Sequence, residues 1–260
     1  MNEWVSKSIK IANSSGYLDR LHEIYPVIHE AERKIAKELE AQLKRVYDED
    51  DDVALVKELL RLEKFPIKDP YVAFLRKKDA FIGYNPETVA RIAKRIRDMG
   101  FQEMLSSIKE PKEFNRQIGP LFKRWIPRIG YPVLAEAEFK EYDQDVAFLQ
   151  GNDRQLQNFA NDYLGCELAK GPDFIARVRE KFVVGEAKFL TDYGGHQSAQ
   201  FRDALELLRG KKGKAVRVAV LDGIVWIEDS TRMYKAVSVL EEIALTALLL
   251  KEFLQSLRLN

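Results

Sequence analysis

The segment from Lys170 to Arg202 constrains the fold most, because it predicts an antiparallel β-hairpin that carries charged residues on one face. If the chain reverses at Arg179 and Glu180, Asp173 and Glu186 stand equally far from the reversal and lie directly opposite each other. Directly opposed residues share a face of the hairpin, with Cβ atoms about 4.5–5.5 Å apart. This separation lets two carboxylates share one metal ion.

The same register places Lys188 beside the two acids, because Glu186 and Lys188 are two residues apart and side chains alternate along a strand with a period of two. Opposed carboxylates repel each other in a purely structural hairpin, whereas a bound divalent cation offsets the repulsion. The two turn residues lack the Asn-Gly or Gly sequence typical of two-residue loops. A longer loop or a bulge, with a shifted register, is therefore the alternative.

The dipeptide Pro172-Asp173, followed later by Glu186-Ala187-Lys188, resembles the motif of the PD-(D/E)XK nuclease superfamily, which includes most type II restriction endonucleases. The resemblance implies a mixed α/β fold in which helices flank a central mixed β-sheet. It also implies that Asp173 and Glu186 bind Mg²⁺. Lys188 would then help to position or activate the attacking water.

The chain around the motif follows an order similar to the common core of the superfamily. A helix capped by Asn152 or Asp153 precedes the hairpin, and the loop DYGGHQ, a helix to about Arg209 and an apolar strand follow it. The resemblance covers roughly residues 152–227. In the superfamily the helix before the first core strand often supplies a further acid, for which Asp153 and Glu138 are candidates. Helix capping is the alternative role of Asp153.

Polar and basic residues on both sides of the motif are candidates for contact with DNA. Gln197 opens the helix after the lysine, where the resemblance implies an accessory role. Aromatic and basic residues alternate between Lys109 and Arg128, which suits contact with a nucleic-acid backbone, although a helix with an aromatic core face and a basic outer face has the same sequence. His196 is a DNA contact, a general base or a turn residue. The DNA-contact candidates are Arg116, Lys123, Arg124, His196, Gln200, Lys211 and Lys212.

Two regions are expected along the chain. Residues 1–130 predict a mainly helical region for DNA contact, dimerisation or both, and residues 131–260 predict the nuclease core. Within the core, AVRVAVLDGIVWI predicts a strand, a turn at Asp222-Gly223 and a second short strand. The segment from Asp229 to Leu257 predicts one long apolar helix, buried against the sheet or a second subunit.

Composition predicts a soluble, cytoplasmic protein without a nucleotide cofactor. The formal net charge of +1 gives no global basic field that would by itself indicate a nucleic-acid partner. Cys166 is the single cysteine, which excludes an intramolecular disulfide and a cysteine zinc cluster. No secretory signal is expected, because the first residues, MNEWVSKSIKIANSS, lack an apolar core and a small-residue cleavage site. The sequence also has no apolar run of membrane-spanning length and no GxxxxGK[ST] motif.

The leading hypothesis is a type II restriction endonuclease, a Mg²⁺-dependent enzyme that cuts double-stranded DNA at a specific sequence. By analogy with such enzymes, a homodimer is expected. The second hypothesis is another nuclease of the superfamily that repairs DNA or resolves junctions. The third is a non-catalytic helical DNA-binding module in which Asp173 and Glu186 are exposed strand residues.

Overall fold

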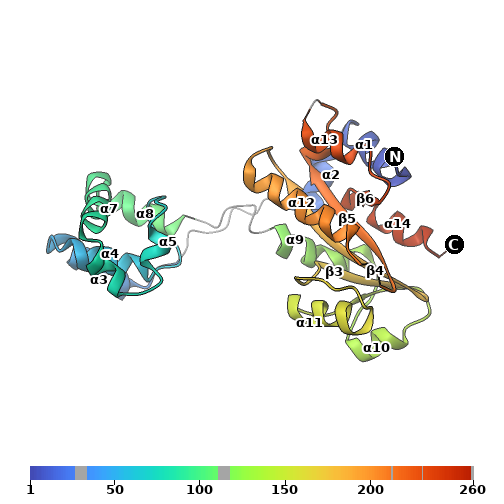
Figure 1. Cartoon of the computed structure of the whole chain (residues 1–260), viewed down its shortest axis with the longest axis horizontal. Coiled ribbons are helices and arrows are strands. Elements are labelled where there is room, and N and C mark those ends of the chain that lie inside the picture. Colours follow the sequence, from blue (N-terminus) through green and yellow to red (C-terminus); the bar gives the residue numbers. More distant parts are fainter. Residues whose placement is uncertain (27–33, 111–117, 212, 230, 259–260) are drawn as a thin grey trace. The chain divides into compact units, whose positions relative to one another are not determined.

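The computed structural model describes residues 1–26, 34–110, 118–211, 213–229 and 231–258. The chain divides into two compact units, Met1–Val27 with Glu113–Asn260, and Ile28–Lys112. The first unit is built around a β-sheet and the second is helical (Figure 1). This division differs from the expected boundary at residue 130, because helices from both ends of the expected helical region pack against the sheet.

A six-stranded sheet forms the centre of the first unit, in the order β1-β2-β3-β4-β5-β6. β2, β3 and β4 are antiparallel neighbours, whereas β1 runs parallel to β2, and β5 runs parallel to both β4 and β6. The mixed α/β class expected from the sequence is therefore confirmed. The strands are β1 (Val133–Leu134), β2 (Val146–Leu149), β3 (Phe174–Val178), β4 (Lys181–Leu190), β5 (Ala215–Gly223) and β6 (Ile243–Leu245).

β3 and β4 form the predicted hairpin in the predicted register. Val178 pairs with Lys181, which leaves only Arg179 and Glu180 in the turn. Arg179 has a positive φ of 54°, a conformation that glycine or asparagine more often supplies in such turns. The turn therefore has the two residues that the predicted register requires, although Arg-Glu is an unusual sequence for a two-residue turn.

Side chains of β4 alternate between two buried layers. Phe182 and Val184 belong to a cluster with residues of α10 (Glu136–Glu141) and α11 (Asp153–Asn158). Val183 and Ala187 belong to the other layer. By this alternation Glu186 and Lys188 lie on the face of Phe182. The helices that contribute to the other layer include α1 (Glu3–Ala12), α2 (Tyr17–Ile24), α9 (Ile118–Trp125) and α14 (Leu250–Ser256).

The helices expected on either side of the hairpin are confirmed. α11 begins with a capping box, in which the Asn152 side chain accepts a hydrogen bond from the Gln155 N–H and the Gln155 side chain accepts one from the Asn152 N–H. α12 (Gly195–Arg209) connects β4 to its parallel neighbour β5, as a parallel pair requires. The two helices therefore bracket the hairpin in the chain as the motif predicts.

The predictions of one long helix from Asp229 to Leu257 and of a second strand after Gly223 are wrong. A 3₁₀ turn, Ile224–Trp226, follows β5, and the chain then forms α13 (Arg232–Val237), β6, a 3₁₀ turn at Ala247–Leu249, and α14. The apolar run becomes a strand at β6 because the edge of β5 offers backbone partners there, and pairing buries Ala244 and Leu245 completely.

The second unit is a set of helices with a hydrophobic core of its own. Leu43, Leu59 and Ile92 are among its fully buried residues. None of the helices in the described parts of the chain is long and apolar enough to cross a lipid bilayer. The helices of this unit are α3 (Lys37–Asp48), α4 (Asp52–Leu60), α5 (Val72–Leu75), α6 (Ala80–Tyr84), α7 (Pro86–Met99) and α8 (Phe101–Lys109).

Candidate active site

The backbone of the hairpin fixes Asp173 opposite Glu186. The Asp173 N–H donates to the Gly185 carbonyl at 2.9 Å, which extends the ladder of β3 and β4 by one residue. The Asp173 carboxylate accepts a hydrogen bond from the Ala187 N–H at 2.8 Å. Strand β4 therefore orients the first carboxylate of the motif.

Two lysines converge on Glu186, whose side chain is only 3% exposed. Lys188 Nζ donates to Glu186 Oε1 at 2.5 Å, and Lys170 Nζ donates to the same oxygen at 2.7 Å. Lys188 Nζ also lies 3.9 Å from Asp173 Oδ2. The structure thus brings the three predicted residues together, with the lysine between the two carboxylates.

The pKa of Asp173 is raised to about 6. Burial is the largest cause, and the negative charge of Glu186 raises the pKa further. Lys188, the Ala187 N–H and Lys123 lower it in part. The raised pKa indicates that the neighbouring positive groups compensate the Asp173 charge only in part, and a bound cation would supply the remaining compensation.

The donor set fits a hard divalent cation such as Mg²⁺. Asp173 and Glu186 offer carboxylate oxygens, and Asp173 also lines a cavity of about 170 Å³. Within the described part of the chain, no group of three or more His, Cys, Asp or Glu residues is placed to hold a metal. Two carboxylates are sufficient for Mg²⁺, which commonly keeps several water ligands and takes others from substrate phosphates.

Lys170 is a residue of this cluster that the motif does not include. It stands in the irregular segment before β3 and lies 3.4 Å from Asp203 on α12 as well as bonding to Glu186. Burial by itself lowers the pKa of the Lys170 ammonium, but its interactions with Glu186 and Asp203 outweigh that effect and leave the pKa raised. Sequence reasoning missed Lys170 because no strand or helix period relates it to Glu186.

The two accessory acids do not contact the carboxylate pair. Asp153 is exposed and forms an ion pair with Lys123, while Asn152 caps the helix in its place. Glu138 is exposed in the first turn of α10. No hydrogen bond or ion pair among the described residues connects Glu138 or Asp153 to Asp173.

Gln197 has no hydrogen bond to Asp173, Glu186 or Lys188 among the described residues. Its side chain is buried, and Nε2 donates to Thr191 Oγ1 at 3.1 Å, which holds the loop that follows β4. Its Oε1 is buried without a hydrogen-bond partner among the described residues. His196 and Gln200 pair with each other one turn apart on α12, with 3.0 Å between their Nε2 atoms.

The basic candidates have different surroundings. Arg124 is exposed on α9, Lys123 pairs with Asp153, and Lys211 pairs with Glu167. Arg116 and Lys212 lie outside the described residues. Only Arg124 among the described basic candidates is therefore both exposed and without an ion pair to another described residue.

Asp222 is a buried carboxylate on the opposite face of the sheet, and the predicted turn at Asp222-Gly223 is wrong because both residues belong to β5. Asp222 pairs in register with Phe189, and it is completely buried. It accepts hydrogen bonds from the Tyr25 hydroxyl at 2.8 Å and the Thr246 hydroxyl at 2.5 Å. Burial raises its pKa to about 6. The contacts join β5 to the residue that follows α2 and to the segment after β6, which indicates a structural role.

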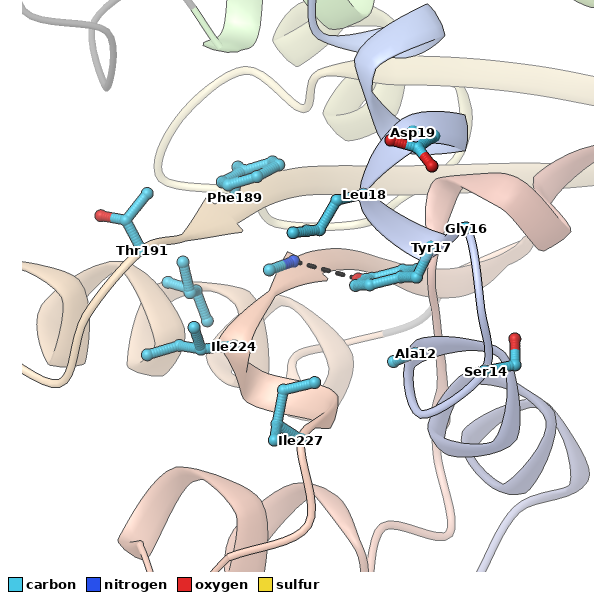
Figure 2. Close-up of a pocket in the computed structure, with 12 residues that line it drawn as sticks. Ala12, Ser14, Gly16, Tyr17, Leu18, Asp19, Phe189, Thr191, Ile224 and Ile227 are labelled. Atoms are coloured by element: carbon cyan, nitrogen blue, oxygen red, sulfur yellow. Dashed lines mark hydrogen bonds between the residues drawn. The ribbon is translucent and has the colours of Figure 1, made fainter.

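A cavity of about 610 Å³ opens beside Tyr17 and Gly223, the residue that follows Asp222 (Figure 2). Leu18 of α2, Phe189 and Thr191 at the end of β4, and Ile224 line it, and the Gly223 N–H donates to the Tyr17 hydroxyl at 3.1 Å. Its lining is mostly apolar and contains neither Asp173 nor Glu186. The cavity is therefore separate from the carboxylate site.

One of three comparisons with known proteins gives a match. A protein-family model described as "Tsp45I type II restriction enzyme" matches residues 2–257. The comparisons with curated proteins and with solved structures give no significant match. The family match covers both the carboxylate site and the helical unit.

Proposed function

The chain belongs to the Tsp45I type II restriction enzyme family, and on that premise we propose that it cuts double-stranded DNA by a Mg²⁺-dependent PD-(D/E)XK mechanism at Asp173, Glu186 and Lys188. Membership of this family makes the protein a site-specific deoxyribonuclease. It favours the restriction enzyme over a repair nuclease and over a non-catalytic module.

The observation that carries the proposal is the contact of Lys188 with both carboxylates. Lys188 Nζ lies 2.5 Å from Glu186 Oε1 and 3.9 Å from Asp173 Oδ2, within a buried hairpin. A structural ion pair needs one acid, and two buried acids facing each other destabilise a hairpin unless further positive charge binds there. The arrangement is the one expected of a metal-dependent phosphodiesterase.

Each of the three side chains has a defined task in the proposed reaction. Asp173 and Glu186 would hold the ion through their carboxylate oxygens. Bound Mg²⁺ supplies Lewis-acid activation for in-line hydrolysis of the phosphodiester. Lys188 would orient the attacking water and neutralise the negative charge that develops on the phosphoryl oxygens.

We also expect the enzyme to act in the cytoplasm as a homodimer. Twofold-symmetric interfaces are the commonest assembly of soluble proteins, and a twofold dimer reads a twofold-symmetric sequence with two identical surfaces. Sedimentation of the protein with and without DNA would test the dimer. Sedimentation as a monomer in both conditions would contradict it.

Incubation of plasmid DNA with the protein and Mg²⁺ tests the proposed chemistry. The wild-type protein should give discrete fragments, and EDTA should abolish cleavage. Asp173→Ala and Lys188→Ala should each lower the cleavage rate by at least about 100-fold, because each removes charge stabilisation of the transition state.

Lys140→Ala is a matched control, because Lys140 also pairs with a glutamate, Glu136, but on the surface of α10. It should cut at the wild-type rate. Circular dichroism and thermal melting would confirm that all variants are folded. Retained cleavage by a folded Asp173→Ala or Lys188→Ala protein would remove that residue from the mechanism.

A further inference from the structure

An exposed aromatic cluster lies on the helical unit, far along the chain from the motif. Tyr71, Phe74 and Tyr84 are 57%, 54% and 76% exposed. All three stand within the segment 71–84, which contains α5 and α6. Buried Val72, Leu75 and Ile82 anchor the same segment in the core, so the fold of the unit does not require the exposed rings.

Phe74 and Tyr84 are connected through the ring of Phe81. Phe74 stacks on Phe81 with 4.5 Å between ring centroids, and Phe81 lies 6.4 Å from Tyr84. Tyr71 stands three residues before Phe74, on adjacent turns, and the Arg91 guanidinium lies 5.5 Å from its ring. Large apolar side chains gathered in this way on a surface typically mark a binding site.

Basic side chains accompany the rings and are largely free of acidic partners. Arg76, Lys77 and Lys78 follow Phe74 closely in the chain and are exposed. Lys78 lies 6.0 Å from the Phe81 ring, and the Arg76 guanidinium donates to a backbone carbonyl. The Lys77 side chain forms no hydrogen bond or ion pair with any other described residue.

The basic residues of the neighbouring helix α7 differ in this respect. Arg91 pairs with Asp69, Lys94 with Asp98, and Arg97 with Asp52. Residues 76–78 are therefore better suited to contact DNA phosphates than the basic residues of α7, because neighbouring acids do not neutralise their charges.

We propose that the segment 71–84, here called the aromatic-basic surface, binds the DNA substrate, with Lys77 and Lys78 on phosphates and Phe74 and Tyr84 against base or sugar faces. Positive side chains contact the phosphate backbone, and exposed rings stack on or wedge between bases. A second copy of this chain is a poorer partner, because a self-complementary contact brings the same lysines together. The inference rests on the proposed function and extends it by naming a DNA contact in the helical unit.

Fluorescence anisotropy with a labelled duplex that the wild-type protein cuts once tests this surface. Binding is measured in EDTA, which prevents cleavage, over a range of salt concentrations. The plot of log K against log salt has a negative slope. In the double variant Lys77→Ala/Lys78→Ala the magnitude of this slope should be smaller by about 2, one for each lysine removed from a phosphate. Tyr84→Ala should weaken binding roughly 5- to 100-fold and leave the slope unchanged, because stacking releases no counterions.

The double variant Lys44→Ala/Arg45→Ala is the matched control. It removes two adjacent basic residues from α3 of the same unit, but these pair with Asp48 and Glu49, and it should keep the wild-type slope. Asp173→Ala should bind the duplex and fail to cut it, which separates a failure of the proposed catalysis from a failure of this surface.

Three results would overturn the proposal. The first is wild-type affinity and slope in both folded surface variants. The second is a change from dimer to monomer in Tyr84→Ala with unchanged DNA affinity, which would assign the surface to self-association. The third is a wild-type protein that cuts the duplex in Mg²⁺ but does not bind it in EDTA.

Discussion

Lys170 donates a hydrogen bond to Glu186 Oε1 at 2.7 Å, although it belongs to an irregular segment outside the hairpin. This ammonium occupies one of the oxygens that a metal ion would use. Asp203 stands 3.4 Å away as a second acceptor. Lys170 can therefore compensate the charge of Glu186 before an ion binds and transfer to Asp203 when one does.

Lys170→Met should consequently strengthen the binding of a divalent cation in the absence of DNA, by about 3- to 10-fold. The change removes a competing charged hydrogen bond worth about 1 kcal/mol at a half-exposed position. Titration with Mn²⁺, followed by electron paramagnetic resonance, measures the affinity directly. Lys211→Met is the control, because Lys211 pairs with Glu167 and has no contact with Glu186. Weaker Mn²⁺ binding would show that Lys170 instead orients Glu186 for the ion.

Metal binding should depend on pH through Asp173. Because its pKa is raised to about 6, the carboxylate is ionised at pH 8 and protonated at pH 5. Affinity for Mn²⁺ should therefore be constant above about pH 7 and fall about tenfold per unit below pH 6. Isothermal titration between pH 5 and pH 8 measures this profile. An affinity that stays constant down to pH 5 would contradict the raised pKa.

The same pKa predicts how Mg²⁺ affects stability. The folded-state pKa of Asp173, about 6, lies above its ordinary value of 3.8. Ionisation therefore destabilises the fold, and this cost is absent below about pH 4, grows from there to about pH 6 and is complete above it. Mg²⁺ should raise the melting temperature at pH 8 and much less at pH 5. An equal effect at both pH values would contradict the assignment.

Gly185→Ala should destabilise the hairpin by about 1–3 kcal/mol. A Cβ atom at Gly185 would lie 2.1 Å from Cε1 of Phe174, its partner across the ladder. The ring is buried and cannot move aside without disturbing its neighbours, so cleavage should fall as well. Urea unfolding measures the loss. Gly83→Ala is the control, because a Cβ atom at this position of α6 would meet nothing within 4 Å, and it should gain about 0.5–1 kcal/mol.

Asp222→Ala should cost about 3–5 kcal/mol of folding free energy, because it leaves the hydroxyls of Tyr25 and Thr246 and the Ala247 N–H without their buried acceptor. Tyr25→Phe removes one donor and keeps the acceptor, so its cost should be about 1 kcal/mol. Urea unfolding of both variants gives the comparison. Equal losses would show that packing of Tyr25, and not the buried network, determines the effect.

Local sequence was sufficient to predict the hairpin that carries the motif. The period of two along a strand and a symmetric reversal placed Glu186 opposite Asp173 and Lys188 beside it, and the structure has this register. The cap of α11 and the end of α12 near Arg209 were also predicted from residues close together in the chain. The roles of the accessory acids and of most basic candidates stay predictions, since they depend on where DNA lies.

The sequence by itself therefore determined the hairpin, its register and the three residues of the motif, because these follow from residues close together in the chain. Only the tertiary structure decided the rest. The segment Ile243–Leu245 is apolar enough for a helix or a buried strand, and the open edge of β5 selected the strand. Lys170 contacts Glu186 from an irregular segment without a period, and Asp222 accepts hydrogen bonds from Tyr25, just after α2, and from Thr246, just after β6. Such contacts join segments far apart in the chain, so no local pattern records them.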